Sequence, residues 1–275
     1  MTYPLTMKLE QFTRFEQEER ERLNALMSYP TQSFAKGETI IEQGEKVTDV
    51  HLVLTGLAAR SKTLADGSRQ TLAFLVPGDL CDVEVFILEA MDHDIVAMAQ
   101  TTCLLVPADV MEELLTQSSN ITRAMWWSTM TDSAILREWI VDHGSRDARE
   151  RIAHLFYEML VRYRVVGETT DDSIPFPITQ EELADATGMT PVHVNRILGQ
   201  LRAEGLVEIR GKVLTILDPK RLREVAQYDP RYLHLIRTER RDGEVSSRAG
   251  DLVGASGHGI VHDALQKVTG KFGGS

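Results

Sequence analysis

The sequence predicts an α+β protein with an N-terminal antiparallel β-roll (double-stranded β-helix or jelly-roll-like), a long helix, and a C-terminal winged helix-turn-helix domain. Three observations predict this class. Short β-rich segments between glycine turns fill residues 34–107, a stretch without glycine or proline runs from Ala108 to His143, and two helix patterns followed by a hairpin pattern occupy 178–217. The expected parts are the roll with an N-terminal helix at 1–107, the long helix at 108–145, the winged helix at 146–230 and a flexible tail at 231–275.

The net charge excludes a uniformly basic nucleic-acid binder. The 275 residues hold 30 Lys+Arg against 41 Asp+Glu, a formal net charge of −11. The charge is uneven, because residues 1–145 hold 11 Lys+Arg and 22 Asp+Glu, whereas residues 146–230 hold 12 and 14. A DNA-binding surface in the third part is therefore still compatible with the composition.

The chain is expected to be cytoplasmic and to make no membrane contact. No apolar run approaches the roughly 18 residues that a membrane-spanning helix needs. The two cysteines, Cys81 and Cys103, fall short of a disulfide framework or of a four-thiolate cluster. Reduced thiols are the corresponding expectation.

The first part combines a helix pattern with a β-roll pattern. Apolar residues recur at helical spacings over 8–29, and Pro30 ends that pattern. From residue 34 onward, glycines beside polar residues separate β-rich segments every 7–12 residues, which is typical of a compact antiparallel roll. The Asp-Gly pair in ADGS at 65–68 predicts a hairpin.

The stretch from Ala108 to His143 predicts one continuous helix of about 54 Å. Its apolar stripe is longer than one small roll can cover. The stripe packs either against its own domain or along a two-fold dimer seam, and its length favours a dimerisation helix. The residues expected at this seam are Ile121, Met125, Trp126, Ile135 and Trp139.

The segment EELADATGMTPVHVNRILGQL, residues 181–201, has helix-turn-helix spacing. Thr179 with Glu182 predicts a capping box for the first helix, and Gly188 predicts the tight turn. Thr190 caps the second helix, where Pro191 needs no N–H partner. An ordinary helical hairpin is the alternative, but LVEIRGKVLTIL after it reads as a two-stranded wing.

The second helix of this unit is expected to enter the DNA major groove. Arg196 can make a bidentate contact to guanine, Asn195 to adenine, and Val192 can touch a thymine methyl. The candidate base-reading residues are Thr190, Val192, His193, Asn195 and Arg196. The candidate phosphate contacts are Thr179, Gln180, Arg202, Arg210 and Lys212. For each of these side chains a solvated surface role is the alternative.

The span from about 30 to 220 resembles the Crp/Fnr transcription regulators. The resemblance rests on FAKGETIIEQGEKVTDVHLVLTGLA, on PGDL, on the long helix and on ITQEELADATGMTPVHVNRILGQL. It implies a cyclic-nucleotide-binding-like roll, a dimerisation helix and a winged helix. It also implies a homodimer that binds palindromic double-stranded DNA and contacts RNA polymerase.

The effector pocket that the resemblance implies is degenerate in this sequence. In members that bind cyclic AMP, a Gly-Glu pair holds the ribose and an Arg-Ser or Arg-Thr pair holds the phosphate. The corresponding positions here are Asp82, Val83, His93 and Asp94, and no arginine lies between Arg69 and Arg123. A neutral imidazole is a poor substitute for a guanidinium fork. The expectation is a regulator that does not depend on cyclic AMP and whose small-molecule effector is unknown.

The sequence predicts no cofactor, no metal and no enzyme. Iron–sulfur members need an N-terminal set of cysteines, and the first 30 residues hold none. Acidic neighbours should raise the thiol pKa of Cys81, which disfavours a reactive redox thiol. The side chains of Asp92, His93 and Asp94 are adjacent in sequence and point apart, which disfavours a metal site. Two alternatives stay open: a cyclic-nucleotide-responsive regulator with a divergent pocket, and a protein-interaction module that does not bind DNA. Activation, repression and target genes also stay open.

Overall fold

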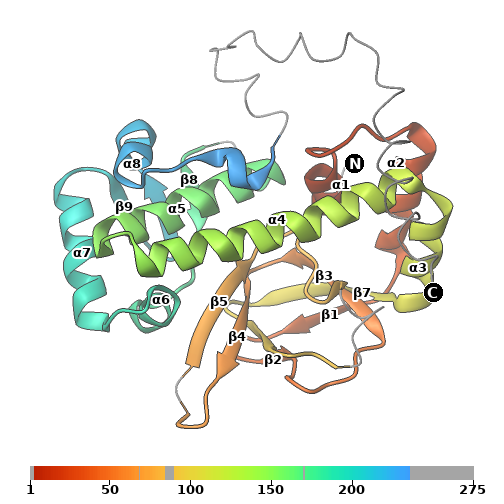
Figure 1. Cartoon of the computed structure of the whole chain (residues 1–275), viewed down its shortest axis with the longest axis horizontal. Helices are drawn as coiled ribbons and strands as arrows, with labels where there is room; N and C mark the ends of the chain where they lie inside the picture. Colours follow the sequence, from red (N-terminus) through yellow and green to blue (C-terminus); the bar gives the residue numbers. More distant parts are fainter. Residues whose placement is uncertain (1–2, 68, 84–89, 170, 236–275) are drawn as a thin grey trace, which may run out of the picture. The chain divides into compact units, whose positions relative to one another are not determined.

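The computed structural model describes residues 3–67, 69–83, 90–169 and 171–235 (Figure 1). It confirms the expected class, an antiparallel β domain followed by long helices and a helix-turn-helix domain. The seven strands of the first domain are β1 (Thr31–Phe34), β2 (Thr39–Ile41), β3 (Asp49–Thr55), β4 (Ala58–Thr63), β5 (Arg69–Leu75), β6 (Asp94–Ala97) and β7 (Thr101–Pro107).

These strands form two antiparallel sheets, in the orders β1-β7-β3 and β2-β6-β4-β5. The predicted hairpin at 65–68 joins β4 to β5, with Gly67 at a φ of 83° that favours glycine. Buried apolar side chains from both sheets meet between them, including Phe34, Ile41, Val53 and Ile95. The two sheets therefore enclose one apolar interior, as a β-roll requires.

The single helix expected over 8–29 is wrong. The chain instead forms α1 (Pro4–Leu9), α2 (Gln17–Ala25) and the 3-10 helix η1 (Leu26–Ser28). A capping box between Glu16 and Glu19 starts α2 afresh. The segment between α1 and α2 is buried through Phe12 and Phe15. Some of the apolar residues that suggested one helix therefore lie in the loop between α1 and α2 and are buried there.

The long helix is also interrupted, at Ser118. Helix α3 (Ala108–Gln117) ends there and α4 (Ser119–Gly144) begins. Ser118 is extended, with φ −139° and ψ 110°, and its Oγ accepts a hydrogen bond from the Ile121 backbone N–H at 3.1 Å. The same Oγ donates to Glu19 Oε1 at 2.6 Å. A side-chain cap tied to α2 therefore replaces the continuous helix that the composition predicted.

Four of the five residues expected at a dimer seam are buried inside this chain instead. Ile121 and Met125 pack in the core with the N-terminal helices, and Ile135 and Trp139 pack against the roll and the winged helix. Only Trp126 is exposed, at 63%. The assignment of the other four to a seam is wrong, because the N-terminal helices, the roll and the winged-helix domain cover that side of α4.

The winged-helix domain begins with α5 (Ala148–Val165), which a capping box of Asp147 with Glu150 starts. The further elements are β8 (Ser173–Pro175), α6 (Gln180–Thr187), α7 (Pro191–Ala203), β9 (Val207–Arg210), β10 (Val213–Ile216), α8 (Pro219–Val225) and the 3-10 helix η3 (Pro230–Leu233). Strand β8, which the sequence did not predict, makes a third strand in the order β8-β10-β9.

The folded part continues beyond residue 230, where a flexible tail was expected to start. Leu233 is 2% exposed, and the Tyr232 hydroxyl donates to Glu158 Oε2 at 2.8 Å. Packing of η3 against α4 and α5 explains this extension. The rest of the expected tail, from residue 236, lies outside the described residues. Within the described part, none of the helices has the length and apolarity to cross a membrane.

A buried ion cluster joins the roll to α5. The Asp79 carboxylate, in the turn after β5, accepts from Lys8 Nζ at 2.8 Å and from Arg162 Nη2 at 2.6 Å. Burial by itself raises the pKa of Asp79, but the two cations outweigh burial and lower the pKa to about 2. The carboxylate is therefore ionised and paired at neutral pH.

This pairing predicts a specific acid sensitivity. Because the folded-state pKa of Asp79 is depressed, its contribution is present above the unfolded value of 3.8 and is lost as the pH falls toward about 2. We expect the free energy of unfolding to drop by about 2 kcal/mol over this window from Asp79 alone. Urea denaturation at a series of pH values measures it. Asp79→Asn should lack this pH-dependent loss of unfolding free energy. If the wild type and Asp79→Asn lost the same unfolding free energy over this pH range, Asp79 would not be its source.

Candidate nucleic-acid interface

Local signals build the helix-turn-helix as expected. The Thr179 side chain accepts from the Glu182 backbone N–H at 3.2 Å, and Glu182 Oε2 accepts from the Thr179 N–H at 2.7 Å. Gly188 ends α6 with a φ of 63°. Thr190 then caps α7 by accepting from the His193 N–H, with Pro191 in the first turn. The predicted capping box, turn and second cap are confirmed.

The two helices cross on a tight apolar contact. Leu183 and Ala184 of α6 and Val194 and Ile197 of α7 are all at most 4% exposed. Burying this face leaves the N-terminal half of α7 turned to solvent. Val192 is 81% exposed, and Thr190, Asn195 and Arg196 are exposed, whereas His193 is half-buried. The structure thus brings the five candidate base-reading residues together at the N-terminal end of α7.

Two of the candidate base-reading side chains already have polar partners within this chain. Asn195 Nδ2 donates to Gln180 Oε1 at 2.9 Å, which links α7 to the first residue of α6. Arg196 Nη2 lies 3.0 Å from His193 Nε2. Such contacts restrict the rotamers of Asn195 and Arg196 and reduce the entropy lost on binding.

The wing is a tight hairpin. Strand β9 pairs with β10 in the register Arg210 to Val213, and Gly211 and Lys212 between them have φ values of 56° and 66°. Positive φ at both central residues is the signature of a type I′ turn. Arg210 and Lys212 are exposed at this hairpin, and Arg202, Thr179 and Gln180 are exposed at the ends of α7 and α6. The wing and the helix ends therefore offer the candidate phosphate contacts to solvent.

The roll reaches the helix-turn-helix directly, which the sequence did not indicate. Lys36 Nζ donates to Glu182 Oε2 at 2.9 Å and to the Pro177 carbonyl at 3.0 Å. Gln70 Nε2 on β5 donates to the Asp185 carbonyl at 2.7 Å. These contacts hold α6, the first helix of the motif, against β5 and against the turn between β1 and β2.

The expected effector positions hold structural contacts. Asp82 is fully buried, and its oxygens accept from the His51 backbone N–H and lie 2.7 Å from His51 Nδ1. Burial lowers the pKa of His51, but the hydrogen bond and charge of Asp82 outweigh burial and raise it. Asp82, which stands at the first of the two ribose-binding positions, is therefore bound to His51 of β3.

The expected phosphate positions are similarly occupied. Asp94 opens β6 and accepts from the Gln43 N–H at 2.8 Å. His93 Nδ1 is hydrogen-bonded to Asp92, and this contact lowers the pKa of Asp92. Val83 is half-buried and packs against the apolar cluster that contains Met111 and Leu114 of α3. Among the described residues, no group of three or more His, Cys, Asp or Glu is arranged to hold a metal ion.

A buried arginine near this region was missed from the sequence. Arg60 on β4 is 7% exposed, donates to the Leu80 carbonyl at 3.1 Å and pairs with Asp132 of α4 at 3.4 Å. Strand β4 also carries Ser61, Lys62 and Thr63, so nothing in the sequence set Arg60 apart as a buried residue. Its charge is compensated by α4 of the same chain.

Both cysteines are buried and near each other. A hydrogen bond with Cys103, followed by burial, raises the pKa of the Cys81 thiol well above its ordinary value. The predicted direction is confirmed. The cause differs, because Asp82 contributes less than Cys103 does.

Comparisons with known proteins agree with this architecture. The model of the cyclic nucleotide-binding domain matches residues 31–118, and that of the Crp-like helix-turn-helix domain matches residues 150–225. The transcriptional activator protein FnrL of Cereibacter sphaeroides is 28% identical over 221 residues, 78% of this chain and 87% of FnrL. The nitrogen fixation regulation protein FixK of Bradyrhizobium diazoefficiens is 25% identical over 193 residues, 70% of this chain and 80% of FixK.

A solved structure gives the same result. FixK2 from Bradyrhizobium japonicum has a TM-score of 0.65 at 25% identity, covering 73% of this chain and 98% of FixK2. Fold, helix-turn-helix and relatives together define a transcription regulator that binds DNA through a helix-turn-helix domain. Within that class, the chain belongs to the Crp/Fnr family.

Proposed function

We propose that this regulator is a homodimer that binds palindromic promoter sites without requiring cyclic AMP. The observation that carries the proposal is the exposed N-terminal half of α7, where polar side chains with base-reading chemistry stand beside the 81% exposed Val192. In a two-fold dimer, two such helices enter major grooves about one DNA turn, roughly 34 Å, apart. A palindromic operator is the DNA counterpart of that symmetry.

The side chains divide into base-reading and phosphate-binding sets. Arg196 donates a bidentate pair of hydrogen bonds to guanine, Asn195 pairs with adenine, and Val192 contacts a thymine methyl. Thr190 and His193 complete the base-reading set at the start of α7. The phosphate-binding set comprises Thr179, Gln180, Arg202, Arg210 and Lys212, all of which are exposed. These contacts position the protein on DNA without selecting its sequence.

The dimer seam lies on the exposed side of α4. Its apolar residues are Trp126, Trp127, Met130, Leu136, Ile140 and Val141, which are 38–71% exposed. At about 100° per residue these positions fall on one half of the helix. This helix face also carries the exposed Arg137, but its six exposed apolar side chains make it suited to a second copy of the same helix.

The contacts made at the effector positions support the proposed independence from cyclic AMP. Asp82 and Asp94 are tied to His51 and Gln43, and Arg60 is paired with Asp132. We expect isothermal titration calorimetry with cyclic AMP or cyclic GMP to give no binding at micromolar concentrations. Micromolar binding of either nucleotide would instead establish a nucleotide-responsive regulator with a divergent pocket.

The dimer on its promoter is further proposed to contact RNA polymerase in the cytoplasm. Genome-wide mapping of binding sites by chromatin pull-down and sequencing tests the proposed binding to palindromic promoter sites. An enriched palindromic motif with salt-sensitive binding in vitro supports it. Recovery of chromatin without such a motif, together with equal affinity for unrelated sequences, would favour a protein-interaction module.

A further inference from the structure

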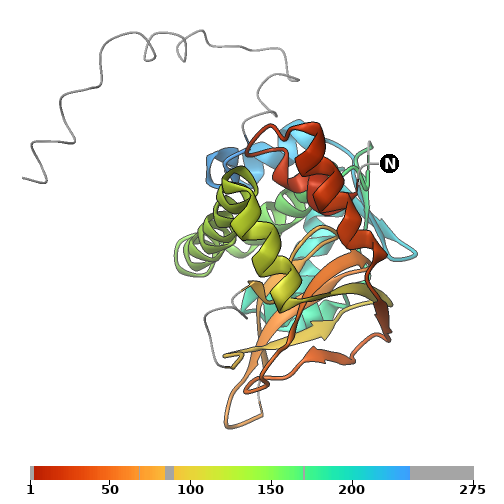
Figure 2. The ribbon, with the colours of Figure 1, turned by 90° about the vertical axis from the view of Figure 1, so that its right-hand side faces the viewer.

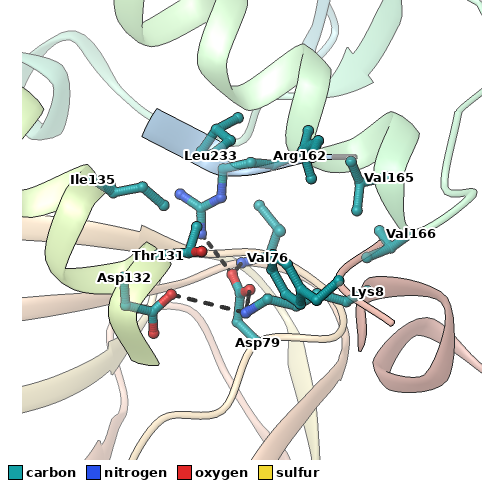
Figure 3. Close-up of a pocket in the computed structure, with 12 residues that line it drawn as sticks. Lys8, Val76, Asp79, Thr131, Asp132, Ile135, Arg162, Val165, Val166 and Leu233 are labelled. Carbon is teal, nitrogen blue, oxygen red and sulfur yellow. Dashed lines mark hydrogen bonds and ion pairs between the residues drawn. The ribbon is translucent and has the colours of Figure 1, made fainter. Parts of the chain in front are cut away.

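The turn that follows β5 makes an ionic contact with the DNA-binding domain. Asp79 in this turn is 2% exposed, and the Val76 N–H donates to its Oδ2 at 2.7 Å. The same oxygen accepts from Arg162 Nη2 at 2.6 Å, across 83 positions in the sequence. Figure 3 shows the Arg162 guanidinium reaching from its helix to this carboxylate, with Lys8 and Asp132 beside it. One carboxylate thus joins the roll to helix α5.

Arg162 is held by the roll at a second point. Its Nη2 also donates to the Phe74 carbonyl of β5 at 2.9 Å, and its Nη1 lies 3.4 Å from Glu158 one turn earlier on α5. Burial lowers the pKa of Arg162, but Asp79 and the other nearby carboxylates raise it overall. The guanidinium therefore stays charged. Its Nη2 donates to both roll acceptors while Nη1 faces Glu158, so the planar group fits one arrangement of these partners.

The backbone at this turn is in direct contact with the same helix. Gly78 has a φ of 89°, and a Cβ there would lie 3.0 Å from the Pro4 carbonyl and 3.1 Å from Val166 Cγ1. The turn therefore contacts both α1 and the residue that ends α5. The apolar contacts around it, including Phe74 with Trp139, supply adhesion but little directional constraint.

We propose that Asp79 and Arg162 are positioning residues for DNA recognition. Their ion pair fixes α5 against the roll and so fixes where α7 stands relative to α4. In a dimer built on α4, that position sets the distance between the two recognition helices. A buried ion pair suits this role because its charge-assisted hydrogen bonds require particular distances and directions. The inference rests on the proposed palindrome-binding dimer.

Operators with altered half-site spacing test the role. The wild-type protein should bind its palindrome and lose affinity when two base pairs are inserted between the half-sites. Asp79→Asn and Arg162→Gln should bind the normal palindrome about tenfold more weakly, because simultaneous binding of two half-sites becomes less favourable. Their affinity for a single half-site should be unchanged, and their penalty for the altered spacing should be smaller than that of the wild type.

Arg164→Gln is the matched control. Arg164 lies two residues further along α5, but it pairs with Asp172 within the winged-helix domain. It should keep the wild-type spacing profile. Arg162→Lys retains the charge without the fork and should fall between the wild type and Arg162→Gln, which keeps the test usable if Asp79→Asn does not fold.

Two outcomes would overturn the inference. One is a wild-type spacing profile in Arg162→Gln and Asp79→Asn. The other is an equal loss on the half-site and on the palindrome, which would indicate a general loss of structure. A wild-type protein that binds no palindrome would instead overturn the proposed function itself.

Discussion

Arg196→Ala is expected to remove most of the discrimination between the operator and random DNA. A bidentate contact from arginine to guanine contributes about 1–3 kcal/mol of selectivity, so affinity for each half-site should fall about 10- to 100-fold. Affinity for random DNA should change little, because that binding depends on phosphates. Fluorescence anisotropy on operator and random duplexes at the same salt concentration measures both quantities.

Lys212→Ala is the appropriate control for the base-reading role. Lys212 is exposed in the wing turn and is expected to contact a phosphate. Its loss should weaken both DNAs alike and reduce the slope of log affinity against log salt by about 1. If Arg196→Ala also weakened operator and random DNA equally, its base-reading role would be refuted.

The second large effect is expected at the exposed face of α4. Met130 is 50% exposed near the middle of this face, and Met130→Glu would place two carboxylates against each other in an apolar seam. We expect a monomer in sedimentation velocity. Affinity for the palindrome should fall about 10²- to 10⁴-fold, because the second half-site no longer binds intramolecularly. Affinity for a single half-site should persist.

Leu64→Glu controls for the introduction of a charge at an exposed apolar position. Leu64 is 56% exposed in the loop that joins β4 to β5. This variant should remain a dimer with normal operator affinity. A dimeric Met130→Glu would place the interface elsewhere on the molecule.

Sequence predicted the helix-turn-helix well because its signals are local. The capping box of Thr179, the positive φ of Gly188 and the cap by Thr190 depend only on neighbours within four residues. Local signals of this kind are not easily overridden, since every orphan N–H at a helix start needs a partner. The wing turn at Gly211 belongs to the same category.

Predictions that depended on distant contacts were less successful. The break at Ser118 follows from its bond to Glu19, 99 positions away, and nothing in a Gln-Ser-Ser-Asn stretch forbids a helix. Periodicity located the apolar residues of α4, but it could not show which of them the roll covers. The pairs of Arg60 with Asp132 and of Asp79 with Arg162 are likewise invisible before the fold is known.

The shared apolar core also bears on how such regulators can diverge. Phe74 from the roll, Trp139 from α4 and Ile152 from α5 belong to one continuous cluster, with the Phe74 and Trp139 rings 5.8 Å apart. In Figure 2 the yellow-green α4 and the green α5 lie above the orange strands of the roll. Consider a hybrid in which this roll is joined near residue 145 to the winged helix of a relative. The new winged helix would need apolar side chains that pack against Phe74 and Trp139, in addition to a correctly placed junction. The DNA-binding region is thus not a freely exchangeable module. Operator preference can change most easily through substitutions on α7. Val192 and Asn195 face solvent there, so they can vary without repacking the core.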